Sequence, residues 1–365
     1  MRKGFYYYGR SVLLLGLLIG YPRNVLAEGK KGEGRAESTS IRYVETHVHL
    51  TANSDAGFNA ATEAALNSMD SLGIRKCLLM PQPFTSDNPN LYDYQVLAEI
   101  VKKNPARFAF LGGGGLLNPM IYKSAKAGRV TEAMRKEFRG KAEEIVKAGA
   151  VGFGEFAMEH FSFFQNHPYL SVSPDHPLFR LLSDIAAEHN LPIDIHMEAV
   201  PRDDFSFPQD QFTKRSDKNP EFLKENIKLL ERLLAYNRKV RIVWAHAGWD
   251  HTGAMTVELI RRLLAKHPNL YFSLKDHSHS FSRNRILDST GKLKPEWKKI
   301  IGDFPGRFLL GSDMFYCDPK LPQQFPDSTR GSRLILSQLS PEVARKVAYE
   351  NAESLYGIKV EKPGF

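Results

Sequence analysis

Short apolar runs alternate with longer amphipathic stretches along most of the chain, and this alternation constrains the fold more than any other feature. Each apolar run ends in polar residues or glycine, and a segment with helical periodicity follows it. The apolar runs predict strands at 41–48, 74–81, 107–112, 150–156, 192–196, 240–246, 269–275 and 307–313. The segments between them predict helices, among them 59–71, 92–103, 131–147, 176–189, 220–236 and 253–266.

Eight successive strand–helix units favour an α/β protein with an all-parallel sheet. Closing that sheet gives a (β/α)8 barrel of the TIM type, with a length of about 315 residues. An open doubly wound sheet is the alternative. It predicts a glycine-rich fingerprint after the first strand, where this chain has His47-Val48-His49. We therefore expect the closed barrel.

Three long connections, 113–130, 199–219 and 276–295, each follow a predicted strand. Connections longer than about 12–15 residues are usually functional lids or disordered segments. In a barrel, all three would lie at the carboxyl ends of the strands, which is the end where active sites form.

The first residues predict export. Arg2, Lys3 and Arg10 precede an apolar segment, 11–21, which is too short to cross a bilayer as a helix of roughly 20 residues. We expect residues 1–27 to be a signal peptide for the periplasm or secretion, with no other membrane contact. Residues 28–40 predict a flexible linker, 41–357 the barrel domain, and 358–365 a short tail.

Charge and cysteine content exclude some classes of protein. The chain has a formal net charge of +9, but its basic residues are scattered among acids, so we expect no nucleic-acid partner. Cys77 and Cys317 lie in separate apolar segments, which indicates two buried thiols rather than a disulfide framework. The sequence leaves assembly into a homo-oligomer open.

Side chains that bind metals fall at the carboxyl ends of five predicted strands. Alternation along a strand places His47 and His49 on the same face, so both can point into the barrel. Any one such residue is readily explained as a hydrogen-bonded or solvated strand end, but their coincidence at one rim favours a metal site. The candidate ligands are His47, His49, Glu155, His196, His246 and Asp313.

The order of these residues resembles that of the metal-dependent hydrolases of the amidohydrolase superfamily. The segments "ETHVHL", "VWAHAG", "LLGSD" and "NAESLYG" are most similar to the amidohydrolase-related branch, which includes lactone hydrolases and metal-dependent decarboxylases. "GFGEF" is closer to the TatD-type deoxyribonucleases, in which a strand-four glutamate bridges two metals. The first resemblance implies His47, His49, His196 and Asp313 as ligands, with His246 as a catalytic residue.

A divalent metal at this rim would make a bound water acidic near neutral pH. Zinc is favoured, as one or two ions, with manganese, iron and nickel as alternatives. Asp313 would accept the proton of the attacking water and pass it to the leaving group. With one ion, His246 would polarise the substrate or shuttle a proton; with two, Glu155 would bridge them or orient a ligand. Asp194 and Glu45 could also orient ligands.

Other polar residues predict a substrate side to the rim. The candidates for binding are Lys275, Arg202, Arg283 and Trp249, near His277, His279, Arg285, Lys214 and Arg215. These cations could receive a carboxylate or phosphate on a small-molecule substrate, although a solvated loop face explains them equally well.

We therefore expect an exported metal-dependent hydrolase acting on a small ester, lactone or amide. A non-oxidative decarboxylase of an aromatic or unsaturated acid is the second interpretation, and a TatD-like phosphoesterase is the third. A binding protein without catalysis is not favoured, because no expected ligand position holds an inert residue.

Overall fold

The computed structural model describes residues 41–360 except for 89, 164–166, 207–215, 278–282 and 323–327. Thr39–Phe365 form one compact unit. The expected signal peptide and linker at 1–40 lie outside the described residues, as do 361–365 and the substrate candidates Lys214, Arg215 and His279.

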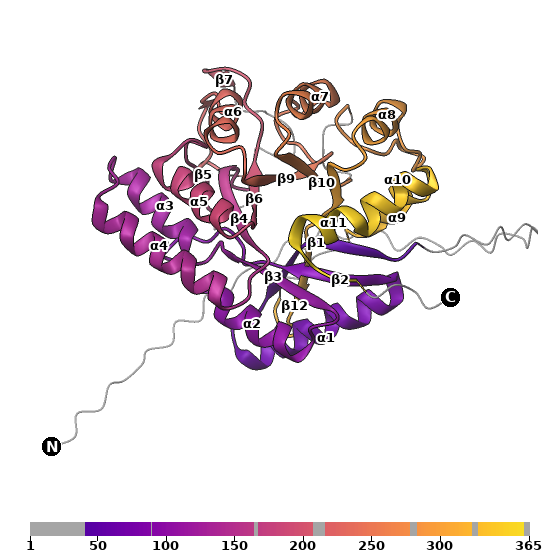
Figure 1. Cartoon of the computed structure of the whole chain (residues 1–365), viewed down its shortest axis with the longest axis horizontal. Coiled ribbons are helices and arrows are strands. Elements are labelled where there is room, and N and C mark those ends of the chain that lie inside the picture. The colour runs from indigo at the N-terminus through magenta and orange to yellow at the C-terminus, as the bar shows by residue number, and fades with distance from the viewer. Residues whose placement is uncertain are drawn as a thin grey trace, which may run out of the picture. The chain divides into compact units, whose positions relative to one another are not determined.

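The central sheet contains the eight predicted strands in chain order, and neighbouring strands run parallel. Figure 1 shows the strands at the centre with helices outside them. The strands are β1 (Tyr43–Thr51), β2 (Ile74–Leu79), β3 (Phe108–Gly113), β4 (Gly152–His160), β6 (Pro192–Met197), β9 (Arg241–Ala247), β10 (Leu270–Leu274) and β11 (Phe308–Leu310).

The barrel closes between its last and first strands. Shortly after β11 the chain forms β12 (Met314–Cys317), which pairs in parallel with β1 in the register Val48↔Met314. Thr46 Oγ1 donates a hydrogen bond to the carbonyl of Leu310 at 2.7 Å. The predicted TIM-type barrel is confirmed.

Helices pack their apolar sides against this barrel. Six of them correspond to predicted helices, although their ends differ: α1 (Asp55–Leu72), α2 (Tyr94–Lys103), α4 (Glu132–Lys147), α5 (Pro177–Glu188), α6 (Ile227–Tyr236) and α7 (Val257–Lys266). The later helices are α8 (Pro295–Asp303), α9 (Arg330–Leu336), α10 (Pro341–Arg345) and α11 (Asn351–Tyr356), with a π-helical turn at Lys346–Glu350. In α6, for example, Leu230, Leu233 and Leu234 are buried.

Capping and turn residues explain where two helices begin later than predicted. Thr256 Oγ1 accepts a hydrogen bond from Leu259 N at 3.2 Å, so α7 begins at Val257 rather than at residue 253. Before α6, the segment Phe222–Leu223 forms β8, which pairs antiparallel with β7 (Phe205–Ser206). A strand therefore occupies part of the range 220–236 that we expected to be helical.

The prediction that residues 113–130 form a long loop is wrong, because this connection contains the helix α3 (Leu117–Lys126). Leu117 and Ile121 are buried, and Pro119 falls in the first helical turn, where a missing N–H removes no helical hydrogen bond. Another short strand, β5 (Leu170–Ser171), pairs antiparallel with the end of β4.

The C-terminal helical segment of the domain holds the start of β11 in place. Asn351 Nδ2 donates to the carbonyls of Pro305 at 2.8 Å and Phe308 at 2.7 Å, at the start of β11. Ile358, which we assigned to the tail, is buried in one cluster with Leu355. The start of the expected tail therefore packs on the domain.

Cys77 and Cys317 are both buried and are not joined in a disulfide, as predicted. Among the described residues, no helix combines the length and apolar character that a bilayer crossing requires.

Candidate metal centre

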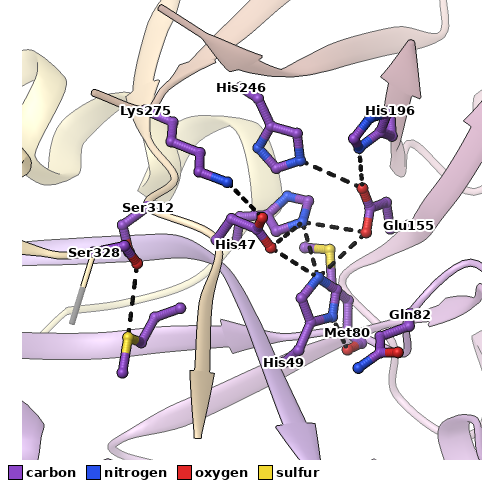
Figure 2. A network of polar contacts seen from close by, with 12 residues as sticks. His47, His49, Met80, Gln82, Glu155, His196, His246, Lys275, Ser312 and Ser328 are labelled. Carbon is purple, nitrogen blue, oxygen red and sulfur yellow. Dashed lines mark hydrogen bonds and ion pairs between the residues drawn. The ribbon is translucent and has the colours of Figure 1, made fainter. Parts of the chain in front are cut away.

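All six predicted ligands lie toward the carboxyl end of the barrel, and their side chains converge. His196 and His246 lie near the ends of β6 and β9, and Asp313 follows β11. His47, His49 and Glu155 lie within β1 and β4, which extend beyond the strand ends that we predicted. Figure 2 shows His47, His49, Glu155, His196 and His246 pointing toward one another. Their side chains are at most 5 % exposed, whereas Asp313 is 12 % exposed. The cluster is therefore buried, with Asp313 as its most accessible member.

Glu155 on β4 stands between two pairs of histidines. Its Oε2 atom lies 3.4 Å from His47 Nε2 and 3.2 Å from His49 Nε2. Its Oε1 atom lies 3.1 Å from His196 Nδ1 and 3.5 Å from His246 Nε2. The two oxygens of one carboxylate thus face different ligand sets.

Asp313 also lies close to His47 and His49. Asp313 Oδ1 lies 3.3 Å from His49 Nε2 and 3.8 Å from His47 Nε2. Its other oxygen, Oδ2, accepts a hydrogen bond from Lys275 Nζ at 2.6 Å. Lys275 is buried and directly follows β10. A side chain from the neighbouring strand end therefore holds the Asp313 carboxylate in place.

Contacts outside the cluster orient the ligands. His49 Nδ1 lies 2.9 Å from the carbonyl of Met80, and His47 Nδ1 lies 3.4 Å from Asp194 Oδ1. Both histidines therefore present Nε2 to the centre. Glu45 Oε1 accepts a hydrogen bond from Ser312 N at 2.6 Å and so fixes the turn that carries Asp313. Asp194 and Glu45 thus have the positions that an orienting role requires.

The buried charges shift each other's proton affinity. Burial alone would raise the pKa of Glu155, but His47 and His196 beside it hold that pKa well below its usual range. Burial would raise the pKa of Asp313 as well, yet the Lys275 ammonium group holds it well below its usual range. Burial lowers the pKa of His246 to about 3, so its imidazole is neutral near pH 7. The neighbouring carboxylates, in contrast, raise the pKa of His47, His49 and His196. Ionised carboxylates and neutral imidazoles are the forms that bind metal, so a metal ion bound here would displace protons from these three histidines.

The backbone is strained at the two residues for which we predicted catalytic roles. His246 has φ 68° and Asp313 has φ 55°, both in the left-handed region that residues other than glycine rarely adopt. Such conformations cost on the order of 1–3 kcal/mol and concentrate at functional sites. Here they turn both side chains into the barrel mouth as their strands end.

The donor set fits a divalent transition-metal ion. Three groups of these candidate ligands have their ligand atoms within 4.8 Å of one another: His47 with His49 and Glu155, His47 with His246 and Asp313, and Glu155 with His196 and His246. Neither buried ring nitrogen of His246 has a hydrogen-bond partner in the described part of the chain. Imidazole and carboxylate together suit zinc, manganese, iron or nickel.

Aromatic and imidazole rings line one side of the ligands. We call Phe163, Trp249, His251 and His160 the ring wall. Trp249 lies 5.4 Å from His246 and 4.5 Å from His251 between ring centroids. Phe163 lies 4.9 Å from His251, and His160 lies 4.3 Å from the metal-ligand candidate His196. Trp249 is the member of this wall that we predicted to bind substrate.

The predicted substrate residues separate into two groups. Lys275 and Trp249 lie beside the ligands, with Lys275 Nζ 3.2 Å from the Trp249 ring centroid. Arg202 is exposed, and its Nη1 donates to the carbonyl of Asp203 in its own loop at 3.4 Å. Arg283 Nη2 donates to the carbonyl of Gly253 at 2.9 Å. The described contacts of these arginines lie outside the metal cluster, and their substrate roles remain predictions.

Two further substrate candidates differ in the same way. Arg285 Nη2 pairs with Asp276 Oδ2 at 2.9 Å, whereas the His277 ring lies 6.3 Å from that of Trp249.

Sequence reasoning missed Glu198, which contacts a ligand directly. Its Oε1 atom lies 3.6 Å from His196 Nε2, and its Oε2 atom accepts a hydrogen bond from His251 N at 3.1 Å. Glu198 lies two residues after His196, so strand alternation places both on one face. The two-residue spacing from His196 could therefore have identified Glu198 from the sequence.

A family model described as amidohydrolase matches residues 125–358, which is more than half of the chain. The chain therefore belongs to the amidohydrolase family and is an enzyme of that family. A comparison with curated protein sequences gave no match.

Solved structures with the same fold include decarboxylases and a protein assigned as a hydrolase. The 2,6-dihydroxybenzoate decarboxylase from Rhizobium is 16% identical, with a TM-score of 0.50 over 87% of this chain and 98% of that chain. A dihydroxybenzoic acid decarboxylase from Polaromonas sp. JS666, with bound manganese and the inhibitor 2-nitroresorcinol, is 15% identical, with a TM-score of 0.51 over 87% and 97%. A Pseudomonas putida protein assigned as a 2-pyrone-4,6-dicarboxylic acid hydrolase is 12% identical, with a TM-score of 0.51 over 88% and 99%.

Proposed function

We propose that this chain is an exported metal-dependent hydrolase that acts on a small ester, lactone or amide. The observation that carries the proposal is the buried cluster of four histidines, Glu155 and Asp313 at the carboxyl end of the barrel. A divalent cation held there would acidify a coordinated water and polarise a substrate carbonyl.

The position of Asp313 supports a role in proton transfer. Oδ1 faces the histidine ligands while Lys275 holds Oδ2, and the side chain is partly accessible. In the proposed reaction, Asp313 accepts the proton of the attacking water and then donates it to the leaving oxygen or nitrogen. His246, neutral and strained toward the mouth, holds a second ion or contacts the substrate.

Two ions per chain are favoured by the position of Glu155. One set of ligands would be His47, His49 and Asp313, and the other would be His196 and His246. Glu155 faces both sets, with one oxygen toward each. A carboxylate in that position supports a bridging role between ions roughly 3.5–4 Å apart. Zinc is the favoured metal, with manganese, iron or nickel as alternatives.

The proposal is tested by elemental analysis and by a panel of lactones, esters, amides and phosphomonoesters. We expect bound divalent metal and hydrolysis of at least one carbonyl substrate, both strongly reduced by His47→Ala. Protein that takes up no divalent metal, or activity that is unchanged in His47→Ala, would contradict the proposal. Hydrolysis confined to phosphomonoesters would support the TatD-like interpretation instead.

Non-oxidative decarboxylation is the second candidate, and the ring wall favours it. Phe163, Trp249 and His251 offer flat faces beside the ligands, and the Lys275 ammonium could receive a carboxylate. A planar unsaturated acid would suit these surfaces. Release of carbon dioxide from such acids, without hydrolysis of the carbonyl panel, would establish this alternative.

Export rests on the residues preceding the domain. Arg2, Lys3 and Arg10 with the apolar segment 11–21 have the pattern of a signal peptide. Mass spectrometry of protein expressed from the full gene would test this: a mature chain beginning near residue 28 in the exported fraction is expected. An intact N-terminus on protein found only inside cells would contradict export.

A further inference from the structure

An arginine-lined pocket lies at the end of the barrel opposite the metal ligands. Arg42 directly precedes β1, Gly73 and Arg75 flank the start of β2, and Arg107 directly precedes β3. The candidate metal ligands lie toward the carboxyl end of the barrel, since Val48 and Gly154 pair with the last residues of β2 and β3. Because these strands are parallel, the pocket and the metal cluster occupy opposite ends of the barrel.

The pocket is large enough for a small molecule, and its charge is strongly positive. Its volume is about 540 Å³, within the range of roughly 300–1,000 Å³ that is common for ligand sites. The charged lining residues are Arg42, Arg75, Arg107, Arg333 and a single acid, Asp70. Asp70 Oδ1 lies 2.7 Å from Arg107 Nη1, so one acid pairs with one of the four arginines that line the pocket.

Contacts within the protein position two of the arginines before any ligand binds. Arg107 donates from Nε to the carbonyl of Arg75 at 3.3 Å and from Nη2 to the carbonyl of Ile74 at 3.2 Å. The Arg333 guanidinium lies 5.8 Å from the centroid of the Tyr43 ring. Packing and backbone contacts therefore limit the rotamer entropy that these side chains would lose on binding.

Gly73 lets the arginines approach one another. It ends α1 with φ 65°, a conformation that glycine adopts without strain. A Cβ atom at this position would lie 2.7 Å from Arg333 Nη2 and 4.0 Å from Arg42 Cγ. The missing side chain leaves the space through which Arg333 reaches across the start of β2.

We propose that this pocket binds a phosphate group, separately from the reaction at the metal centre. Guanidinium groups present planar pairs of N–H donors that match phosphate oxygens bidentately, and several together suit a divalent anion. The phosphate could belong to a small soluble molecule or to the headgroup of an anionic lipid. Both sources present the same oxygen atoms to the arginines.

Calorimetric titration of the metal-loaded enzyme with inorganic phosphate tests the soluble source. The pocket variants are Arg42→Gln, at an exposed position, and Arg333→Gln; the matched control is Arg238→Gln, an exposed arginine outside the pocket. We expect phosphate to bind about tenfold or more weakly in each pocket variant and unchanged in the control. Thermal melting without phosphate confirms that each variant is folded.

Sedimentation with phosphatidylcholine vesicles, with or without phosphatidic acid, tests the lipid source. Binding that requires phosphatidic acid and falls in both pocket variants would assign the headgroup. The proposal is overturned if the wild-type protein binds neither probe, or if neither pocket variant weakens the binding that is seen. Substrate turnover is measured in parallel and should not change, so this result is independent of the proposed hydrolase activity.

Discussion

Lys275 Nζ lies 2.6 Å from Asp313 Oδ2 and 3.2 Å from the Trp249 ring centroid, so one buried ammonium joins the predicted proton acceptor to the ring wall. Substituting Lys275→Met should release the Asp313 carboxylate from its fixed orientation. We expect kcat/KM to fall by about 10²-fold or more, with the metal content unchanged. Steady-state kinetics and elemental analysis check this, with exposed Lys224→Met as the control. Unchanged kcat/KM in Lys275→Met would contradict a positioning role for Lys275.

Glu155→Gln tests the two-ion arrangement. The amide cannot supply two anionic oxygens, so the second ion should be lost while His47, His49 and Asp313 keep the first. Elemental analysis should give about two ions per wild-type chain and about one per variant chain. If both proteins hold a single ion with equal affinity, Glu155 is not a bridging ligand.

Asp194→Asn tests how His47 is oriented. The neutral amide would interact more weakly with His47 Nδ1, now 3.4 Å from the carboxylate, and the metal affinity should fall about 10–100-fold. Competition with a chelator measures this affinity. Asp184→Asn is a matched control, because Asp184 contacts Tyr236 and Asn237 instead. Equal metal affinities in the two variants would show that Asp194 does not orient His47 for metal binding.

Glu231 should make stability depend on pH in the acid range. Burial would raise its pKa, but hydrogen bonds from Lys266, His267 and Arg262 bring that pKa to about 2. Because the folded pKa lies below the unfolded value, this contribution is fully present above about pH 5 and declines as pH falls toward 2. It amounts to at most about 3 kcal/mol.

The measurement compares urea unfolding of metal-free wild type and Glu231→Gln. The wild type should be more stable near pH 7, and this difference should shrink by more than half near pH 3. A difference that stays constant between these pH values would show that the carboxylate charge does not carry the effect.

Gly311 allows the strands to meet closely beneath the metal ligands. A Cβ atom there would lie 2.7 Å from Ser273 Cβ and 3.1 Å from His47 Cβ. Gly311→Ala should therefore destabilise the protein by about 1–3 kcal/mol. At Gly140 within α4, a Cβ would meet nothing within 4 Å, so Gly140→Ala should stabilise by about 1 kcal/mol. Denaturant unfolding checks both, and a neutral Gly311→Ala would show that the strands can separate.

The strands and candidate ligands could be predicted because each has a local signal. Apolar runs of strand length marked the barrel, and His47, His49 and Asp313 each closed such a run. The helix α3 was missed because a glycine-rich start and Pro119 obscured its periodicity. Its buried residues, Leu117 and Ile121, show that tertiary packing compensates for a weak local preference.

Contacts between distant segments had no comparable signal. The pairing of Lys275 with Asp313 depends on how strand ends approach across the barrel mouth. In the sequence, Arg42, Arg107 and Arg333 look like ordinary surface charges. Only the fold brings them together around one pocket. Side-chain chemistry can be read from sequence, but convergence of this kind requires the path of the chain in space.

The hydrogen bond from Thr46 to Leu310, and that from Ser312 to Glu45, join the beginning of the domain to a segment near its end. His47 and His49 emerge from the ribosome long before Asp313, yet the three form one ligand group only when the ring of strands is complete. A cation could therefore bind this ligand group only after the barrel has closed, and hence only after any transport of the chain as an unfolded polypeptide.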